Sequence, residues 1–128
     1  MRVARLFDGK DGAGNWRIDP DRPRIDDPEE RERLGRFLAG GVLILRVNGR
    51  ERDILDPAKE HAVGLSTHTD GTWIWSDGVR YYLVKHGIAP EPELVEHIRS
   101  CDYVAAKPDE PVWREALNFV MTRAKNRN

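Results

Sequence analysis

Cysteine is nearly absent from this sequence, which holds a single one, Cys101, among 128 residues. A lone cysteine can form no internal disulfide, so the fold does not depend on an oxidising environment. Long apolar runs are also missing, which argues against a membrane-spanning helix. The first residues lack the apolar core of a signal peptide, and we therefore expect a cytoplasmic protein.

An excess of charge of either sign is missing as well. The chain carries 21 basic and 22 acidic residues, for a formal net charge of −1, and neither sign forms a long run. Proteins that bind nucleic acid usually present a basic surface, so this balance argues against DNA or RNA as the partner. With 39% hydrophobic and 34% charged residues, the composition is typical of a folded domain with a heavily charged surface.

The first forty residues predict a hairpin and a helix. Residues 3–7 and 16–18 have the pattern of two short strands, and an exposed connection is expected over residues 19–24. Asp27 has the properties of a helix N-cap and precedes a proline, and Gly40-Gly41 follows the last apolar residues of the helix.

A continuous apolar run at 42–47 predicts a buried strand. Asn48-Gly49 follows it, and this dipeptide is typical of two-residue hairpin turns. We therefore expect residues 50–55 to pair with the apolar run. Residues 61–67 are a further candidate strand.

The passage at 69–90 carries the clearest local signals in the chain. The Asp-Gly dipeptide at 70–71 predicts a tight turn, and the two tryptophans within 72–75 alternate with other residues as in a strand. A helix is predicted at 77–86, with Gly87 in position to end it.

Two further helices are predicted at 92–101 and 109–124 from apolar stripes of helical period. Because strands and helices fall in separate blocks instead of alternating, we predict an α+β domain. Its expected architecture is a small antiparallel sheet, with one helix inserted early and the C-terminal helices packed on one face. A single domain is expected over residues 1–128, made of an N-terminal hairpin and linker (1–26), a core (27–125) and a frayed tail (126–128).

No stretch carries a catalytic or cofactor signature. The four histidines offer no pair with the spacing of a metal site, so neither a metal nor a cofactor is predicted. The glycine-rich residues 9–14 lack the spacing of a phosphate-binding loop. Cys101 lies one helical turn from His97, but its place on an apolar stripe favours core packing over nucleophilic chemistry. The question of enzymatic activity stays open, and a non-enzymatic role is favoured.

Trp and Tyr side chains are concentrated between residues 73 and 82, and both types are enriched at protein interfaces. We therefore predict a protein-binding module, of an immunity-like or regulatory kind, that uses an aromatic surface. Its candidate contact residues are Trp73, Trp75, Arg80 and Tyr81. At least two of the four aromatic rings between residues 73 and 82 are expected to pack in the core instead, with Trp73 and Trp75 on the core face of the sheet. The alternative is a small-molecule-binding domain or small enzyme with a pocket between the sheet and the 77–86 helix. The polar groups of that pocket would be His68, Asp70, Tyr82 and His86.

A distinctive block is formed by Thr-Asp-Gly-Thr-Trp-Ile-Trp at 69–75, Tyr81-Tyr82, and His-Gly-Ile at 86–88. Together with Leu-Asp-Pro at 55–57, it resembles an uncharacterised actinobacterial family over roughly residues 34–100. The resemblance implies an association with domains of the immunity type found at bacterial toxin loci. It implies no catalytic residue.

Overall fold

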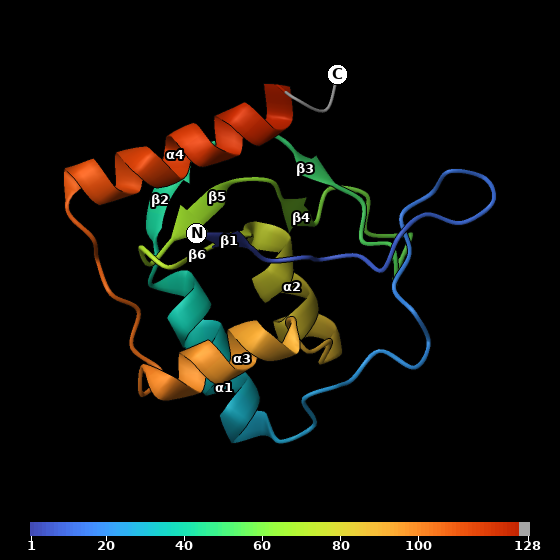
Figure 1. The fold of residues 1–128 in the computed structure, drawn as a ribbon. Coiled ribbons are helices and arrows are strands. Elements are labelled where there is room, and N and C mark those ends of the chain that lie inside the picture. The colour runs from blue at the N-terminus through green and yellow to red at the C-terminus, as the bar shows by residue number, and fades with distance from the viewer. Residues whose placement is uncertain (126–128) are drawn as a thin grey trace.

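Residues 69–90 form the predicted turn, strand and capped helix in the computed structural model, which describes residues 1–125 (Figure 1). The predicted frayed tail lies outside the described residues. The turn is held by Asp70, whose Oδ1 accepts the backbone N–H groups of Thr72 at 3.0 Å and Trp73 at 2.8 Å. This local bonding explains why the Asp-Gly signal was readable from sequence.

Strand β6 (Trp73–Ser76) leads directly into helix α2 (Asp77–His86). Gly87 ends the helix in the left-handed conformation, with a φ of 72°, and its N–H bonds to the carbonyl of Leu83. Glycine is favoured there because it has no Cβ to clash with the preceding turn. The predicted end of the helix is therefore confirmed.

The other helices lie close to their predicted ranges, but the strands differ: the candidate strand at 61–67 is divided between two strands, and residues 16–18 contribute only an isolated bridge of Trp16 with Lys10. Helix α1 begins at the predicted N-cap, where the Asp27 carboxylate accepts the N–H of Glu29 at 3.1 Å. The remaining bounds are β1 (Arg2–Val3), α1 (Pro28–Ala39), β2 (Val42–Leu45), β3 (Arg50–Glu51), β4 (Val63–Gly64), β5 (Thr67–Thr69), α3 (Pro92–Ser100) and α4 (Glu110–Lys125).

Four strands form one sheet in the order β1-β6-β5-β2, and β3 pairs with β4 in a separate two-stranded sheet. The α+β class is confirmed. The main sheet is mixed and not wholly antiparallel, because β1 pairs with β6 in parallel. The long connection between these two strands, which includes α1, allows the parallel pairing that a short hairpin could not make.

The predicted hairpin around Asn48-Gly49 is wrong. Strand β2 pairs with β5, with Val42 opposite Thr69, while β3 turns away to pair with β4. At the end of β2 the N–H of Val47 donates to the hydroxyl of Ser66 at 3.0 Å, which ties this strand to the β5 side. Long-range pairing thus overrides the local turn signal.

Helices cover both faces of the main sheet. Helices α1, α2 and α3 pack on the face that carries Trp73 and Trp75, and α4 packs on Ile44 and Ile74 of the other face (Figure 1). The expectation that the C-terminal helices share one face is therefore corrected for α3 and α4. Side chains alternate between faces along β6, and because Trp73, Ile74 and Trp75 are all apolar, both faces must be covered.

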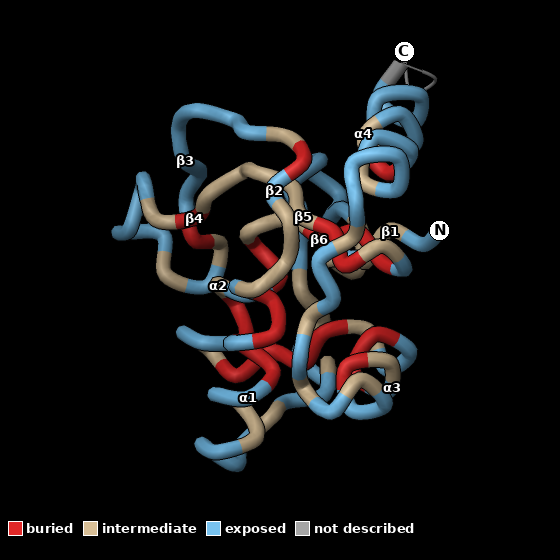
Figure 2. The backbone as a smooth tube through the Cα atoms, turned by 90° about the vertical axis from the view of Figure 1, so that its left-hand side faces the viewer, coloured by how far each residue is buried: buried red, intermediate tan, exposed pale blue. Residues whose placement is uncertain are grey.

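Burial is uneven between these two layers. Buried backbone gathers where α1, α2 and α3 meet the sheet, whereas most of α4 is exposed (Figure 2). Ala116 is the single residue of the 110–124 segment that is buried. The α4 side of the sheet is therefore the thinner layer.

The N-terminal segment is fastened to the rest of the fold. Residues 8–17 form a hairpin loop, closed by backbone hydrogen bonds of Arg17 with residues 8 and 9, but the predicted pairing of a strand at 3–7 with one at 16–18 is not found, because β1 pairs with β6. Most of the connection at 19–24 is exposed as predicted, but the Arg22 side chain is an exception, with only 7% of its surface exposed. Its guanidinium donates to the carbonyls of Leu6 at 2.8 Å and Ala89 at 2.9 Å, so it joins the two chain segments on either side.

Candidate functional site

Three of the four Trp and Tyr side chains between residues 73 and 82 belong to the core. Trp73, Trp75 and Tyr82 are 4%, 1% and 1% exposed. The indole N–H of Trp75 donates to the carbonyl of Leu38 at 3.0 Å, and the Tyr82 hydroxyl accepts the N–H of Ile54 at 3.0 Å. Their polar groups are thus used internally, and these rings offer no contact surface. The expected core packing of at least two rings is confirmed, and Trp73 and Trp75 are corrected as contact residues because helices cover their face of the sheet.

The other two predicted contact residues are tied to the fold. Arg80 is exposed, and its Nε donates to the carbonyl of Gly35 in α1 at 2.9 Å. Tyr81 is partly buried, and its hydroxyl donates to Oδ2 of Asp53 at 2.7 Å. Both residues therefore connect α2 to neighbouring segments.

The predicted polar set of His68, Asp70, Tyr82 and His86 does not converge on one pocket. His68 and His86 each pair with an aspartate outside that set, and Asp70 pairs with a third histidine, His97. The Nε2–carboxylate distances are 2.5 Å for His68 and Asp77, 2.6 Å for His86 and Asp53, and 2.7 Å for His97 and Asp70. The last two pairs join residues 33 and 27 positions apart, so no local spacing could reveal them.

The Asp53 cluster is closed around a carboxylate that is wholly buried. Oδ1 accepts the backbone N–H groups of Leu55 at 2.8 Å and Asp56 at 3.1 Å, and Oδ2 contacts Tyr81 and His86. Burial raises the pKa of the Asp53 carboxyl, but the hydrogen bonds from His86, Tyr81 and Leu55 outweigh it, so the pKa lies below its usual value. Burial and the adjacent carboxylate raise the pKa of Tyr81 to about 12. Every acceptor position of Asp53 is occupied, which is typical of a structural group.

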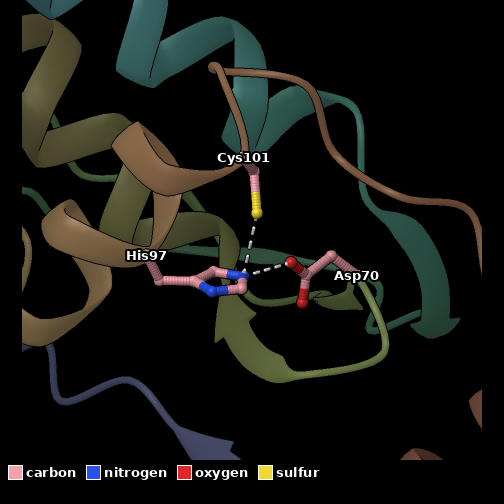
Figure 3. A group of neighbouring side chains, drawn as sticks. All are labelled: Asp70, His97 and Cys101. Atoms are coloured by element: carbon pink, nitrogen blue, oxygen red, sulfur yellow. Dashed lines mark hydrogen bonds and ion pairs between the residues drawn. The ribbon is translucent and has the colours of Figure 1, made fainter.

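The Asp70 cluster has a different third member. His97 and Cys101 lie one turn apart at the end of α3, and both approach Asp70 in the β5–β6 turn (Figure 3). His97 Nε2 lies 2.7 Å from Asp70 Oδ2 and 3.6 Å from Cys101 Sγ. The Asp70 side chain is 2% exposed and that of His97 is 19% exposed. A carboxylate, an imidazole and a thiol are thus gathered at one accessible edge of the fold.

His68 lies in a pocket of about 320 Å³ between the sheet, α1 and α2. This is the position that the alternative hypothesis gave to a ligand pocket, although of its four polar residues only His68 lines it. Arg50, Arg80 and Tyr81 also line the pocket. His68 Nδ1 is buried and has no hydrogen-bond partner among residues 1–125, while Nε2 is held by Asp77.

A larger groove, of about 480 Å³, lies between the N-terminal segment, the β4–β5 region and the end of α4. Trp16 lies at its edge with 48% of its surface exposed, stacked on Phe7 at a ring-centroid distance of 5.5 Å. Leu6 also lines the groove and packs so closely on Gly78 that a Cβ there would lie 2.5 Å from it. The apolar lining includes Leu6, Phe7, Trp16, Val63, Leu65 and Val120.

Trp16 is not among the predicted contact residues, because residues 16–18 have the pattern of a strand. One signal was available, because this tryptophan follows a loop rich in Gly and Asp that has little apolar surface to bury it. Its exposure is therefore the most informative aromatic feature of the molecule. The long-range partners of the histidines left no comparable signal.

Comparison with known proteins gives no guide to the site: no family model, no curated protein and no solved structure matches this chain. Among the helices in residues 1–125, none combines the length and the hydrophobicity needed to cross a membrane. Function must therefore be argued from the geometry of the groove and the clusters.

Proposed function

We propose that the protein is a non-enzymatic binding module whose groove holds an apolar segment of a partner protein. The observation that carries the proposal is the exposed ring of Trp16, stacked on Phe7 at the edge of a groove of about 480 Å³. Exposed tryptophans beside apolar hollows are frequent anchors of protein interfaces. The predicted binding role is thus kept, with Trp16 in place of the buried tryptophans of β6.

Charges at the rim define the chemistry of the partner. Three arginines, Arg5, Arg52 and Arg123, line the groove with one acidic residue, Glu51. Arg5 and Arg52 are 60% and 58% exposed, and their nearest carboxylates lie 3.9 and 3.4 Å away. A partner segment with carboxylates beside its apolar residues would complement this surplus of positive charge.

The composition of the groove favours binding over catalysis. Its lining residues within the described chain include neither histidine nor cysteine, the side chains that most often transfer protons or form covalent intermediates. Instead, the apolar side chains provide contact area for a partner segment, and the arginine side chains can orient it. The immunity-like or regulatory role is part of this proposal, because proteins of that kind act by occupying a partner.

Selection of random peptides on the immobilised protein tests the proposal directly. We expect enriched peptides to combine apolar residues with Asp or Glu, because these match the groove and its rim. Trp16→Ala should weaken their binding by about tenfold or more, the effect of removing an interface anchor. Binding is measured by fluorescence anisotropy of labelled peptides.

Val104→Ala is the matched control, because Val104 is 70% exposed and does not line the groove. This variant should bind the selected peptides as the parent protein does. Equal binding of the peptides to the Trp16 variant, with its circular dichroism unchanged, would contradict the proposal. So would a selection that enriches no peptide.

The His68 pocket supports a second candidate function, the binding of a small anion. One ring nitrogen of His68 is held by Asp77, the other has no partner among the described residues, and two arginines line the same pocket. Titration with inorganic phosphate and acetate, followed by NMR of the histidine rings, tests this function. Shifts confined to His68 would support it, and unchanged His68 signals would exclude it.

A further inference from the structure

We infer that Asp70, His97 and Cys101 form a zinc site with one open coordination position. The inference is separate from the proposed function, since none of the three residues lines the groove. One ligand atom from each side chain lies within 4.8 Å of the other two. The three residue types, thiolate, imidazole and carboxylate, are those that bind Zn²⁺ in proteins.

The imidazole and the thiol already have the spacing of two zinc ligands. Zn–S and Zn–N bonds of about 2.3 and 2.05 Å at a tetrahedral angle place sulfur and nitrogen about 3.5 Å apart. Cys101 Sγ and His97 Nε2 are 3.6 Å apart. Their positions one turn apart at the end of α3 produce this spacing without any change of the backbone.

The carboxylate needs a small adjustment. Nitrogen and oxygen ligands of one tetrahedral zinc ion lie about 3.3 Å apart, whereas His97 Nε2 and Asp70 Oδ2 are 2.7 Å apart in a hydrogen bond. A small rotation of the imidazole or the carboxylate, which moves its ligand atom by a fraction of an ångström, would lengthen this contact enough. The metal would therefore replace a hydrogen bond that the two side chains make in its absence.

The surroundings hold the ligands in place. Oδ1 of Asp70 is occupied by the N–H groups of Thr72 and Trp73, which leaves Oδ2 directed at His97. The ring of Phe37 packs edge-on against the His97 ring at a centroid distance of 6.1 Å. Such outer contacts fix ligand orientation and raise metal affinity.

A protease-like relay does not fit this geometry. In a relay, the carboxylate binds one imidazole nitrogen and the nucleophile contacts the other. Here Asp70 and Cys101 approach the same atom, Nε2 of His97. The three ligand atoms instead lie within 4.8 Å of one another, close enough for one cation bound between them to be chelated.

Zinc suits the charge and the softness of this set. Mg²⁺ and Ca²⁺ favour oxygen ligands, whereas the thiolate and imidazole select Zn²⁺. On binding, Cys101 Sγ releases one proton to solvent and forms the Zn–S bond, and the His97 proton moves to Nδ1. Thiolate and carboxylate then balance the two positive charges of the ion. A water molecule completes the coordination from the side where His97 is exposed.

The test is metal titration of the purified chain after chelator treatment. We expect one Zn²⁺ per chain, with a dissociation constant on the order of a micromolar or below. Co²⁺ used as a probe should give the near-ultraviolet charge-transfer band of a thiolate ligand and the visible bands of tetrahedral coordination. Zn²⁺ should remove both.

Variants assign the ligands. Cys101→Ser should abolish the charge-transfer band, and Asp70→Asn should weaken Zn²⁺ binding by about a hundredfold, at least the effect of losing an outer-shell partner. Asparagine retains an oxygen for the N–H groups of Thr72 and Trp73, so the turn is kept. Circular dichroism of each variant verifies folding.

His68→Gln is the matched control, because it removes a histidine from another aspartate pair that has no cysteine beside it. This variant should bind Zn²⁺ as the parent chain does. Absence of stoichiometric Zn²⁺ binding to the parent chain would overturn the inference. Binding that survives both Cys101→Ser and Asp70→Asn would overturn it equally.

Discussion

The clusters around Asp53 and Asp70 share one plan and differ in one side chain. In each, Oδ1 of a buried aspartate accepts the N–H groups two and three residues ahead, and Oδ2 contacts a histidine from the C-terminal half of a helix. The third partner is the phenol of Tyr81 in one cluster and the thiol of Cys101 in the other. The same backbone device thus supports two different chemistries.

The third partner decides what each cluster can do. Tyr81 donates a hydrogen bond directly to Asp53 and completes a closed network, so that cluster fastens the segment after Asp53 to α2. Cys101 contacts the imidazole of His97, so three potential metal ligands lie close together. We therefore expect the Asp53 cluster to contribute stability and the Asp70 cluster to bind a metal.

The largest effect should come from Asp53→Ala. This change leaves the Tyr81 hydroxyl, His86 and the N–H of Leu55 without their acceptor, and we expect the free energy of unfolding to fall by about 3 kcal/mol. Urea denaturation followed by circular dichroism measures the difference. Asp53→Asn is the control. Its free energy of unfolding should fall by less, because asparagine keeps an oxygen that accepts the backbone N–H groups. A loss from Asp53→Ala below about 1 kcal/mol would contradict the structural role.

The second largest effect should be the stabilisation of the fold by Zn²⁺, which should depend on the Asp70 cluster alone. At a free concentration of one hundred times the dissociation constant, Zn²⁺ should raise the free energy of unfolding by about 2.7 kcal/mol through mass action. Cys101→Ser should remove this increment. Tyr81→Phe, the corresponding change in the Asp53 cluster, should leave it intact. If Zn²⁺ raised the free energy of unfolding equally in the parent chain and in Cys101→Ser, the Asp70 cluster would not be the zinc site.

Local signals predicted the helices well. Asp27 caps α1 through a bond to the second residue after it, and Gly87 ends α2 through bonds within one turn, so a short stretch of sequence contains all the partners. The Asn48-Gly49 signal was equally local, but the pairing of β2 with β5 is decided by contacts between residues far apart in the sequence, as between Val42 and Thr69. Tertiary pairing therefore corrected the local prediction.

The candidate sites were beyond the reach of local patterns. Asp53 meets His86, and Asp70 meets His97, only after the strands and helices have packed. The spacing of His97 and Cys101 was visible in the sequence, but their proximity to the carboxylate of Asp70, the third proposed zinc ligand, was not. The sequence could not decide which of the rings between residues 73 and 82 are buried for a related reason, since burial depends on which helices cover that face of the sheet.

The smallest effect, and the most specific one, should be the ionisation of Tyr81. Its pKa is raised to about 12 by burial and the Asp53 carboxylate, against about 10 in an unfolded chain. The folded state therefore retains this proton more strongly, so the stability from the bond is fully present below pH 10 and is lost as pH rises towards 12. Below pH 10, Tyr81→Phe should lower the free energy of unfolding by about 1 kcal/mol. In phenolate absorbance titrations, the step that disappears in the variant should be centred near the pKa of Tyr81, about 12. If the step that disappears were centred near pH 10, Tyr81 would not be bonded to Asp53. The Asp53 cluster would then not be the closed hydrogen-bond network that distinguishes it from the Asp70 cluster.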